Sequence, residues 1–447
     1  MNCAHIFPQL RKLEQKYANE LMVVGVHSAK FPNEKVKDNL HKAVQRYELG
    51  HPVVNDVDFQ VWQQYACRAW PTLMFIDPLG KVIGKHEGEL SYEQFDTLIS
   101  QMVSEFDEAG ILDRTPVTFV KDEAPDSTLS FPGKVVADAD SNRLFISDSN
   151  HNRIIVATLD GEALKVVGSG ELGMVDGSFA TASFDHPQGM VLVGDLLYVA
   201  DAENHAIRRV DLAAEQVETT AGTGTQGSMR EGTGPGLQTE LNSPWDLAFH
   251  EGYLYIAMAG MHQLWSMDLS TGMVGPYAGS GRESLDDGLL ASATLAQPSG
   301  ITSDGNRLYF ADSETSAVRS ADLDPYGRVR TIIGLGLFEF GDVDGADHNI
   351  RLQHPIGLAH HDGTIYLADT YNHKIKKVLP VMRSSFTLLG NGQAGDRDGA
   401  GNQAQFSEPS GLSIAGGKIY IADTNNHAIR VADLESGEVV TLKLSGI

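Results

Sequence analysis

The chain has 447 residues, a hydrophobic content of 42% and a formal charge of −25. This length suffices for two or three domains with cores of their own. Most of the negative charge follows residue 115, so the larger part of the chain repels phosphate backbones, which argues against nucleic-acid binding. The two cysteines are too few for a disulfide scaffold, and no apolar run reaches the ~20 residues that cross a bilayer. Because no signal segment opens the chain, we expect a cytoplasmic protein without membrane contact.

The first 115 residues alternate between helical and strand patterns, which is typical of an α/β domain. Apolar residues at helical spacing predict helices at residues 6–17, 34–47, 58–65 and 92–105. Apolar runs predict strands at 21–26, near 53, and on both sides of an Asp-Pro-Leu-Gly turn within 70–84. We place this domain at residues 1–106 and a linker at 107–130, with one strand-like segment at 117–120.

From residue 131 onward a motif recurs six times, and its last copy is IADTNNHAIRVADL, Ile421–Leu434. Its third positions, separated by 53, 57, 54, 57 and 54 residues, are Asp148, Asp201, Met258, Asp312, Asp369 and Asp423. A period this regular indicates a repeat architecture. Each period carries four short strand patterns separated by Gly, Asn and Asp turns, which suits a propeller blade. We therefore predict a six-bladed β-propeller over residues 131–447, in which blade one has four strands of its own and borrows none from the other terminus.

Two sets of residues resemble known families. Cys3 at the start of a helix, followed later by RAWPTLMFIDPLG leading into a hairpin, resembles the thioredoxin fold. The motif D-x-x-N-H-x-I, which begins at Asp201, Asp369 and Asp423, is similar to that of NHL-repeat propellers. Nearly the whole chain thus resembles NHL-repeat β-propeller proteins with an N-terminal thioredoxin-like domain. The resemblance implies a multidomain protein, in which an α/β thioredoxin-like domain precedes an all-β six-bladed NHL propeller.

The thioredoxin resemblance implies thiol–disulfide chemistry, but this chain carries only part of the site. Thioredoxin-like enzymes place C-x-x-C where a central strand meets a helix, and the helix dipole lowers the pKa of the first thiol. Cys3 aligns with the second cysteine, whereas the first cysteine and its strand would precede Met1. That strand lies mid-sheet in the family, so its absence leaves two unpaired edges. We expect an N-terminally truncated domain whose native start lies upstream of Met1; the alternative is a degenerate module that fills the gap in another way.

The resemblance also places the family's cis-proline at Pro71, so that Trp70 and Pro71 shape the groove beside the catalytic candidate Cys3. Cys67 lies in an apolar context and is predicted to be a buried small side chain. Only Cys3 is therefore a candidate for thiol chemistry.

The repeated Asp, Asn and His of the blades are predicted to be structural. The carboxylate follows a strand and can cap backbone amides of the next turn. Histidines on separate blades fan outward and cannot form one metal site. The Asp-Gly steps, such as the two carboxylates Asp342 and Asp344 before Gly345, offer too few ligands for a calcium loop. We therefore assign no metal ligand and no cofactor.

A candidate binding face lies just before the innermost strand of each blade, where a proline recurs. The residues that we assign to it are His186, Trp245, Asp246, His354 and Glu408. Trp245 and Asp246 are both interpreted as replacing a glycine that is usual at their positions, in the copy in which Met258 replaces the repeated Asp. We expect this side of the channel to bind a protein partner or a small-molecule ligand.

Three functions are consistent with these patterns. The first is a thiol–disulfide redox module joined to a propeller that recruits a substrate or partner, which is an enzyme only if the upstream cysteine exists. The second is a protein–protein interaction scaffold without catalysis. The third, with less support, is a metal-dependent hydrolase or lyase built into the propeller, by analogy with other propeller enzymes.

Overall fold

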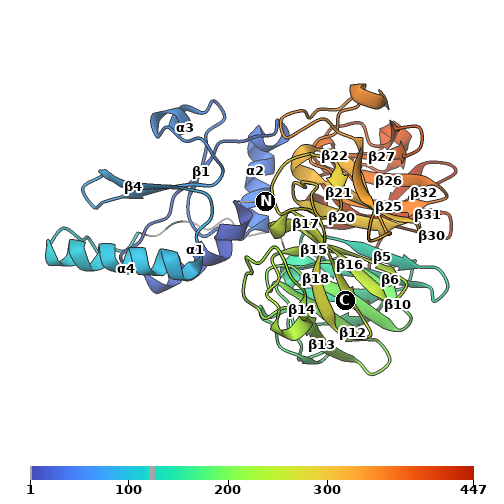
Figure 1. The fold of residues 1–447 in the computed structure, drawn as a ribbon, viewed down its shortest axis with the longest axis horizontal. Helices are drawn as coiled ribbons and strands as arrows, with labels where there is room; N and C mark the ends of the chain where they lie inside the picture. The colour runs from blue at the N-terminus through green and yellow to red at the C-terminus, as the bar shows by residue number, and fades with distance from the viewer. Residues whose placement is uncertain (1–2, 118, 120–125) are drawn as a thin grey trace. The chain divides into compact units, whose positions relative to one another are not determined.

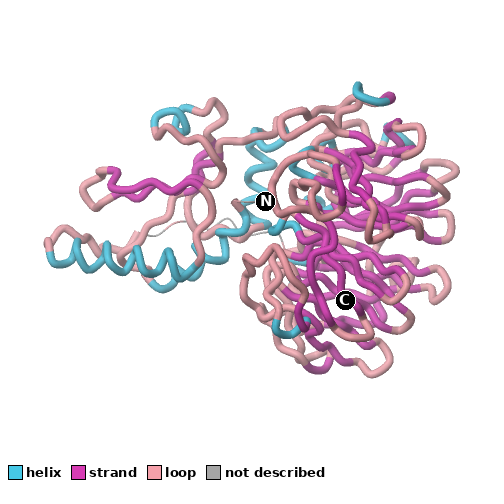
Figure 2. Tube along the Cα trace, in the orientation of Figure 1, coloured by secondary structure: helices cyan, strands magenta, loops and turns pink. Residues whose placement is uncertain are grey.

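The computed structural model (Figure 1) describes residues 3–117, 119 and 126–447, and the chain divides into two compact units, Met1–Pro125 and Asp126–Ile447. The α-helices of the described residues all belong to the first unit, whereas the second consists of strands, loops and short 3-10 helices, as Figure 2 shows. Of the predicted strand-like segment 117–120, residues 118 and 120 lie outside the described part of the chain.

The first unit follows the predicted order of helices and strands. Its helices are η1 Ala4–Ile6, α1 Phe7–Lys16, η2 Asn33–Lys35, α2 Lys37–Arg46, α3 Gln60–Gln64 and α4 Tyr92–Glu108. Its strands are β1 Gly25–His27, β2 Val53–Asn55, β3 Thr72–Ile76 and β4 Val82–Glu87. None of the described helices combines the length and the apolar character that a bilayer-spanning segment needs.

The sheet of the first unit is split in two. β1 and β2 form a parallel pair, β3 and β4 form an antiparallel pair, and no strand among the described residues joins the two pairs. β1 and β3 therefore each keep an edge on which the described residues place no strand, as expected from the sequence. Of the predicted strand 21–26, only the last two residues are in a strand, as part of β1. Apolar side chains at both pairs stay about half exposed, including Val24, Val26 and Ile76.

Helices α1 and α4 pack against each other and against the β3–β4 hairpin. A capping box at Ser91 starts α4 by satisfying two amides that the helix would otherwise leave unpaired. Leu13 of α1 and Tyr17, which directly follows α1, meet Phe95 and Ile99 of α4 in a buried cluster that side chains of β3 complete. This cluster gives the hairpin an apolar core.

The second unit contains six antiparallel sheets, one for each repeat. The innermost strands are β5 Val135–Asp138, β10 Pro187–Val193, β15 Pro244–His250, β20 Pro298–Ser303, β25 Gly357–His361 and β30 Pro409–Ala415. The second strands are β6 Arg143–Asp148, β11 Leu196–Asp201, β16 Tyr253–Met258, β21 Arg307–Asp312, β26 Thr364–Asp369 and β31 Lys418–Asp423. The six predicted blades are thus confirmed.

Two further strands complete each blade, and a short fifth strand extends five of them. The third strands are β7 Arg153–Ala157, β12 Ala206–Asp211, β17 Gln263–Asp268, β22 Ala317–Asp322, β27 Lys374–Leu379 and β32 Ala428–Asp433. The fourth are β8 Ala163–Val167, β13 Gln216–Ala221, β18 Met273–Ala278, β23 Arg328–Ile333, β28 Ser384–Leu389 and β33 Glu438–Thr441. The fifth, at the outer edge of blades two to six, are β9 Gly177–Ser178, β14 Gly234–Pro235, β19 Gly288–Leu289, β24 Gly345–Ala346 and β29 Gly399–Ala400.

The apolar core of the propeller lies between its blades. Neighbouring innermost strands contact one another, and β30 of blade six contacts β5 of blade one, which closes the ring. Six buried clusters each join side chains of two adjacent blades. At the closure, Leu144 and Ile155 of blade one pack with Tyr420 and Ile429 of blade six. Face packing therefore holds each blade to the next, as expected for a ring of sheets.

Blade one has four strands of its own, β5 to β8, as predicted, but the C-terminal segment adds to it. Ser445 forms a parallel bridge with Glu162 and exchanges backbone hydrogen bonds with Gly161 and Ala163. This bridge lies at the outer end of the sheet, where the other blades have their two-residue strand. The C-terminal segment therefore extends blade one without replacing any of its four strands.

Candidate functional site

The Trp70–Pro71 peptide is cis, as the thioredoxin resemblance implies. Pro71 is buried and directly precedes β3. The Trp70 indole donates to the Ser28 carbonyl at 2.8 Å, and its ring centroid lies 4.4 Å from that of Trp62. Trp70 is thereby fixed in a half-buried position at the start of the hairpin.

Cys3 immediately precedes η1 and α1, so that the first amides of a helical segment follow its thiol. Neither cysteine forms a disulfide among the described residues, and both are partly exposed. Cys67 is therefore not the fully buried side chain that its apolar context predicted; its amide donates to the Trp62 carbonyl just after α3. The chain itself contains no C-x-x-C pair.

The repeated Asp of the blades is buried and joins separate segments of its own blade. Asp201 Oδ1 accepts the amide of Asp185 at 2.8 Å, and Oδ2 accepts from Asn204 and Arg208 at 2.8 and 2.9 Å. Matching bonds hold Asp312, Asp369 and Asp423. The structural role is as predicted, but the capped amide lies 16 residues upstream rather than in the next turn. Burial raises the pKa of Asp201 and of Asp423 to about 6, against the opposing effect of the paired arginine.

The repeated His joins one blade to the next. His205 Nδ1 accepts the amide of Ser243, at the start of blade three, at 3.0 Å. The same bond to the following blade is made by His262, His373 and His427, and by the side chains of Asn152 and Ser316 in the two blades that lack the His. All six residues adopt φ between 50° and 53°, and in this conformation each side chain accepts a hydrogen bond from an amide of the next blade. These histidines are therefore part of the architecture.

The aspartates of the Asp-Gly links pair with the same buried cations. Arg208, whose Nη1 binds Asp201, places Nη2 2.9 Å from Asp176 Oδ1. Equivalent pairs are Arg319 with Asp287, Arg430 with Asp398, and Lys376 with Asp342 and Asp344. Each cation thus binds one carboxylate of its blade and at least one of the preceding link. Protein cations therefore bind these carboxylates.

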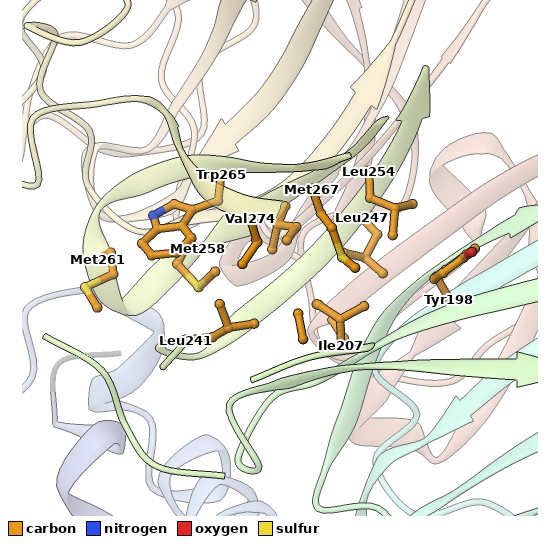
Figure 3. Packing of buried hydrophobic residues seen from close by; sticks show 13 residues of the cluster. Tyr198, Ile207, Leu241, Leu247, Leu254, Met258, Met261, Trp265, Met267 and Val274 are labelled. Carbon is orange, nitrogen blue, oxygen red and sulfur yellow. The ribbon is translucent and has the colours of Figure 1, made fainter. Parts of the chain in front are cut away.

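Blade three departs from this network at three positions together. The apolar side chains that stand in place of Asp, Asn and Arg are Met258, Met261 and Trp265. All three are buried in one cluster, and Figure 3 shows Met258 beside the Trp265 indole. Replacing a buried ion pair with packed apolar groups is often neutral or stabilising. The loss of the repeated Asp at Met258 is therefore a compensated change in the core, and it does not by itself mark blade three as a binding site.

One buried ion pair crosses the ring. Its two residues occupy the second position after the proline in blades one and three. Four blades have glycine there, namely Gly189, Gly300, Gly357 and Gly411, and a Cβ at any of these would lie within 2.5 Å of the neighbouring blade. Blades one and three have Lys134 and Asp246 instead. Lys134 Nζ lies 2.9 Å from Asp246 Oδ2, and it donates to the carbonyls of Ser299 and Ile356 in blades four and five. One lysine thus binds three other blades.

This pair explains the departure from glycine at Asp246 in structural terms. Asp246 is 8% exposed and also accepts the amides of Leu247 and Ile301. Burial raises the pKa of Asp246, and Lys134 opposes the shift. Trp245 does not replace a glycine, because its position varies among the blades. Its half-buried indole has a buried N–H that lacks a hydrogen-bond partner among the described residues.

The other residues of the predicted face, His186, His354 and Glu408, occupy equivalent positions immediately before the proline of their blades. All three are buried, with φ of 51°, 48° and 49°. His186 Nδ1 lies 2.7 Å from Asp185 Oδ1 and 3.7 Å from Glu203 Oε2. His354 Nδ1 lies 3.7 Å from a glutamate, and its ring stacks on Tyr371. Because they occupy equivalent positions of the repeat, these three residues lie at the same end of the ring.

Three residues of this region were not identified from the sequence: Lys134, Asp185 and Glu203. Lys134 could have been found by comparing the second position after the proline in all six copies, since one Lys and one Asp among glycines suggest a pair. Asp185 and Glu203 lie on opposite sides of the β10–β11 hairpin, and no repeat position requires an acid at either. Only the strand pairing shows that they meet.

Comparisons with known proteins agree with this architecture. The model of the thioredoxin-like family matches residues 1–82, and that of the NHL repeat matches residues 406–432. The chain is 45% identical over 472 residues to Protein SUPPRESSOR OF QUENCHING 1, chloroplastic, of Arabidopsis thaliana, and 41% identical over 477 residues to NHL repeat-containing protein 2 of Bos taurus. These alignments include 100% and 98% of the chain but only 45% and 66% of the relatives, so the chain spans about half to two thirds of their length.

A solved structure supports the fold alone. A structural genomics protein of unknown function from Bacteroides thetaiotaomicron matches with a TM-score of 0.52 and 17% identity, over 69% of this chain and 70% of that one. Both family models match in the order that the sequence predicts. The chain therefore belongs to the NHL-repeat β-propeller proteins that carry an N-terminal thioredoxin-like domain.

Proposed function

We propose that the protein joins a thiol–disulfide redox module to a propeller that recruits its substrate or partner. The observation that carries this proposal is the pair of edges at β1 and β3 on which the described residues place no strand. A strand inserted between them would lead into η1 and α1, where Cys3 stands, and would run beside β3, which Pro71 precedes. This arrangement would bring the Cys3 thiol, Trp70 and Pro71 to one end of the completed sheet.

The proposed reaction needs a second thiol beside Cys3. One thiolate attacks a substrate disulfide and forms a mixed disulfide, and the other thiol then displaces the reduced substrate and leaves a disulfide in the protein. Two electrons pass from the dithiol to the substrate. In the family pattern the partner cysteine would stand three positions before Cys3, and the helix that follows would favour a thiolate.

Insulin reduction by dithiothreitol, catalysed by the complete reading frame, tests this proposal, because the external dithiol reduces the protein disulfide again after each turnover. We expect turnover in the wild type, loss of turnover in Cys3→Ser, and unchanged turnover in Cys67→Ser, which removes the other thiol of the same unit. Undiminished turnover in Cys3→Ser, or none in the wild type, would remove the redox assignment and leave the scaffold.

We assign recruitment to the channel mouth, with His186, His354, Glu408 and Trp245. The buried Trp245 N–H supports this assignment, since a protein or small-molecule acceptor could satisfy it. We expect Trp245→Ala to lose a partner that the wild type retains in affinity capture, whereas Tyr253→Ala, at an exposed position of blade three, should keep it. Equal capture by both variants would count against this face. Asp246 is unsuitable for this test because its loss would disturb the ring.

A non-catalytic interaction scaffold is the second candidate, and the absence of a C-x-x-C pair from the chain favours it. The cytoplasm is the compartment expected from the sequence, and the Arabidopsis relative, named chloroplastic, makes the chloroplast the alternative. Localisation of a fluorescent fusion of the complete reading frame would distinguish them.

A further inference from the structure

Three side chains at the open end of the β10–β11 hairpin, in blade two, bring metal-ligating atoms together. Asp185, His186 and Glu203 each contribute one such atom, and the three atoms lie within 4.8 Å of one another. His186 Nδ1 is 2.7 Å from Asp185 Oδ1 and 3.7 Å from Glu203 Oε2. Ligands about 2.0–2.2 Å from a divalent transition metal lie roughly 3–3.5 Å from one another. An ion therefore fits among these atoms after small rotations of the side chains.

The backbone holds all three residues in place. The amide of Asp185 donates to buried Asp201, and the amide of His186 donates to Asn152 Oδ1 of blade one. The amide of Glu203 donates to the Asp185 carbonyl at 3.2 Å across the hairpin. The ligand atoms thus belong to three fixed points of a rigid element, which lowers the entropic cost of binding an ion.

The blade architecture does not need these acids. The positions equivalent to Asp185 in the other blades hold Ser130, Asn242, Ala296, Gln353 and Ser407. Those equivalent to Glu203 hold Asn150, Gly260, Glu314, Tyr371 and Asn425. Within the propeller, blade two alone combines an acid at both positions with a histidine. The capping and inter-blade bonds of the repeat therefore leave this combination unexplained.

We propose that Asp185, His186 and Glu203 bind one divalent transition-metal ion, such as Zn²⁺ or Mn²⁺. One imidazole nitrogen and two carboxylates are ligands that these ions accept, and the two acids supply the negative charge that balances the ion. Three protein ligands leave coordination positions open for water or for a donor atom of a bound molecule, as in catalytic rather than structural sites. The site is independent of Cys3 and goes beyond the proposed thiol chemistry.

Metal titration of the full chain tests the proposal. The protein is stripped with a chelator and titrated calorimetrically with ZnCl₂ and MnCl₂, in a Cys3→Ser/Cys67→Ser background that removes both thiols. We expect one ion per chain and at least a tenfold loss of affinity in His186→Ala. The absorption spectrum of bound Co²⁺ should show nitrogen and oxygen ligands in the parent and should lose its bands in the variant.

His354→Ala is the matched control. His354 is equally buried and has a carboxylate at the same 3.7 Å, but Gln353 stands where blade two has Asp185. The His354→Ala variant should bind the metal ion with the same affinity as the parent. If His186→Ala fails to fold, Asp185→Asn and Glu203→Gln replace it in the titration. Amide side chains occupy these positions in other blades, so both variants should fold. No stoichiometric ion in the parent, or the same affinity in His186→Ala or in both amide variants, would overturn the proposal.

Discussion

At the scale of single residues, the propeller depends on a few buried charges whose partners lie on other blades. Lys134 and Asp246 are 112 residues apart in sequence, and both are nearly inaccessible to solvent. Removing one member of a buried pair leaves the other charge without compensation, whereas replacing both with apolar groups avoids that cost. The stability of the ring is therefore more sensitive to one of these residues than to the pair.

Lys134→Met should lower the free energy of unfolding by about 3–5 kcal/mol, because Asp246 would remain buried with only two amide donors. The double variant Lys134→Met/Asp246→Leu should recover most of this loss. Urea denaturation followed by circular dichroism measures both. A Lys134→Met protein as stable as the wild type would show that the pair contributes little.

Asp423 predicts a pH dependence with a definite sign. Its folded pKa of about 6 exceeds its unfolded value of about 3.9, so the native state binds more protons between these values. The contribution of this group to stability is therefore greatest below pH 4 and falls as the pH rises through 6. We expect the stability of the wild type relative to Asp423→Asn, which cannot ionise, to drop by about 2 kcal/mol from pH 4.5 to pH 7. Parallel unfolding curves of the two proteins at both pH values measure this difference, and no change in it would place the folded pKa near its ordinary value.

At the scale of elements, each blade is a local unit whose polar network can be exchanged as a set. Blade two has Asp201, Asn204 and Arg208 where blade three has two methionines and a tryptophan. The two solutions occupy equivalent positions of the same sheet. Either complete set of side chains therefore stabilises the blade, whereas a mixture of the two sets leaves a buried unpaired charge or a cavity.

This exchange can be tested by building the apolar set of blade three into blade two. Asp201→Met alone should cost about 3–5 kcal/mol, because Arg208 would lose its buried partner. The triple variant Asp201→Met/Asn204→Met/Arg208→Trp should be more stable than that single variant. A double-mutant cycle at Arg209 and Glu218, an exposed pair on the same blade, should give a coupling below about 1 kcal/mol. If the triple variant were the least stable protein, the three positions would not form an exchangeable set.

The elements that the sequence predicted best are those that local patterns determine. Strand alternation and turn residues within one period were sufficient to predict six blades. The break in the thioredoxin pattern before Cys3 was sufficient to predict a split sheet. The site was predicted less completely, because its partners are distant in sequence. Met258 alone suggested that blade three is functional. Trp265, one strand later, stands where blade two has Arg208, and this second change compensates for the loss of the repeated Asp. Asp246 suggested a ligand contact because its partner is a lysine two blades away along the ring.

At the scale of the whole molecule, the ring has one join without a continuous chain across it. There the Phe131 amide donates to His427 Nδ1, and hydroxyls of Ser410 and Thr424 donate to the carbonyls of Gly133 and Pro132. The C-terminal segment adds the bridge at Ser445. These contacts hold the two ends of the propeller together at the one interface that no continuous chain crosses.

Deleting residues 442–447 should destabilise the protein by about 1–3 kcal/mol. The deletion removes the bridge at Ser445 and two partly buried leucines from the cluster between blades six and one, so both hydrogen bonds and apolar contacts are lost. Deleting the exposed Ile447 alone should leave the melting temperature unchanged. Thermal unfolding compares the three proteins, and equal melting temperatures would show that the segment does not support closure.

The hydrogen bond between Phe131 and His427 also constrains how the protein is made. It spans 296 residues, so the ring cannot close during synthesis until the last blade has left the ribosome. Until then blade one presents an apolar face that has no neighbour. A nascent chain stalled after blade five is thus a natural client for chaperones, and the slowest step of folding is expected to be the meeting of the two ends.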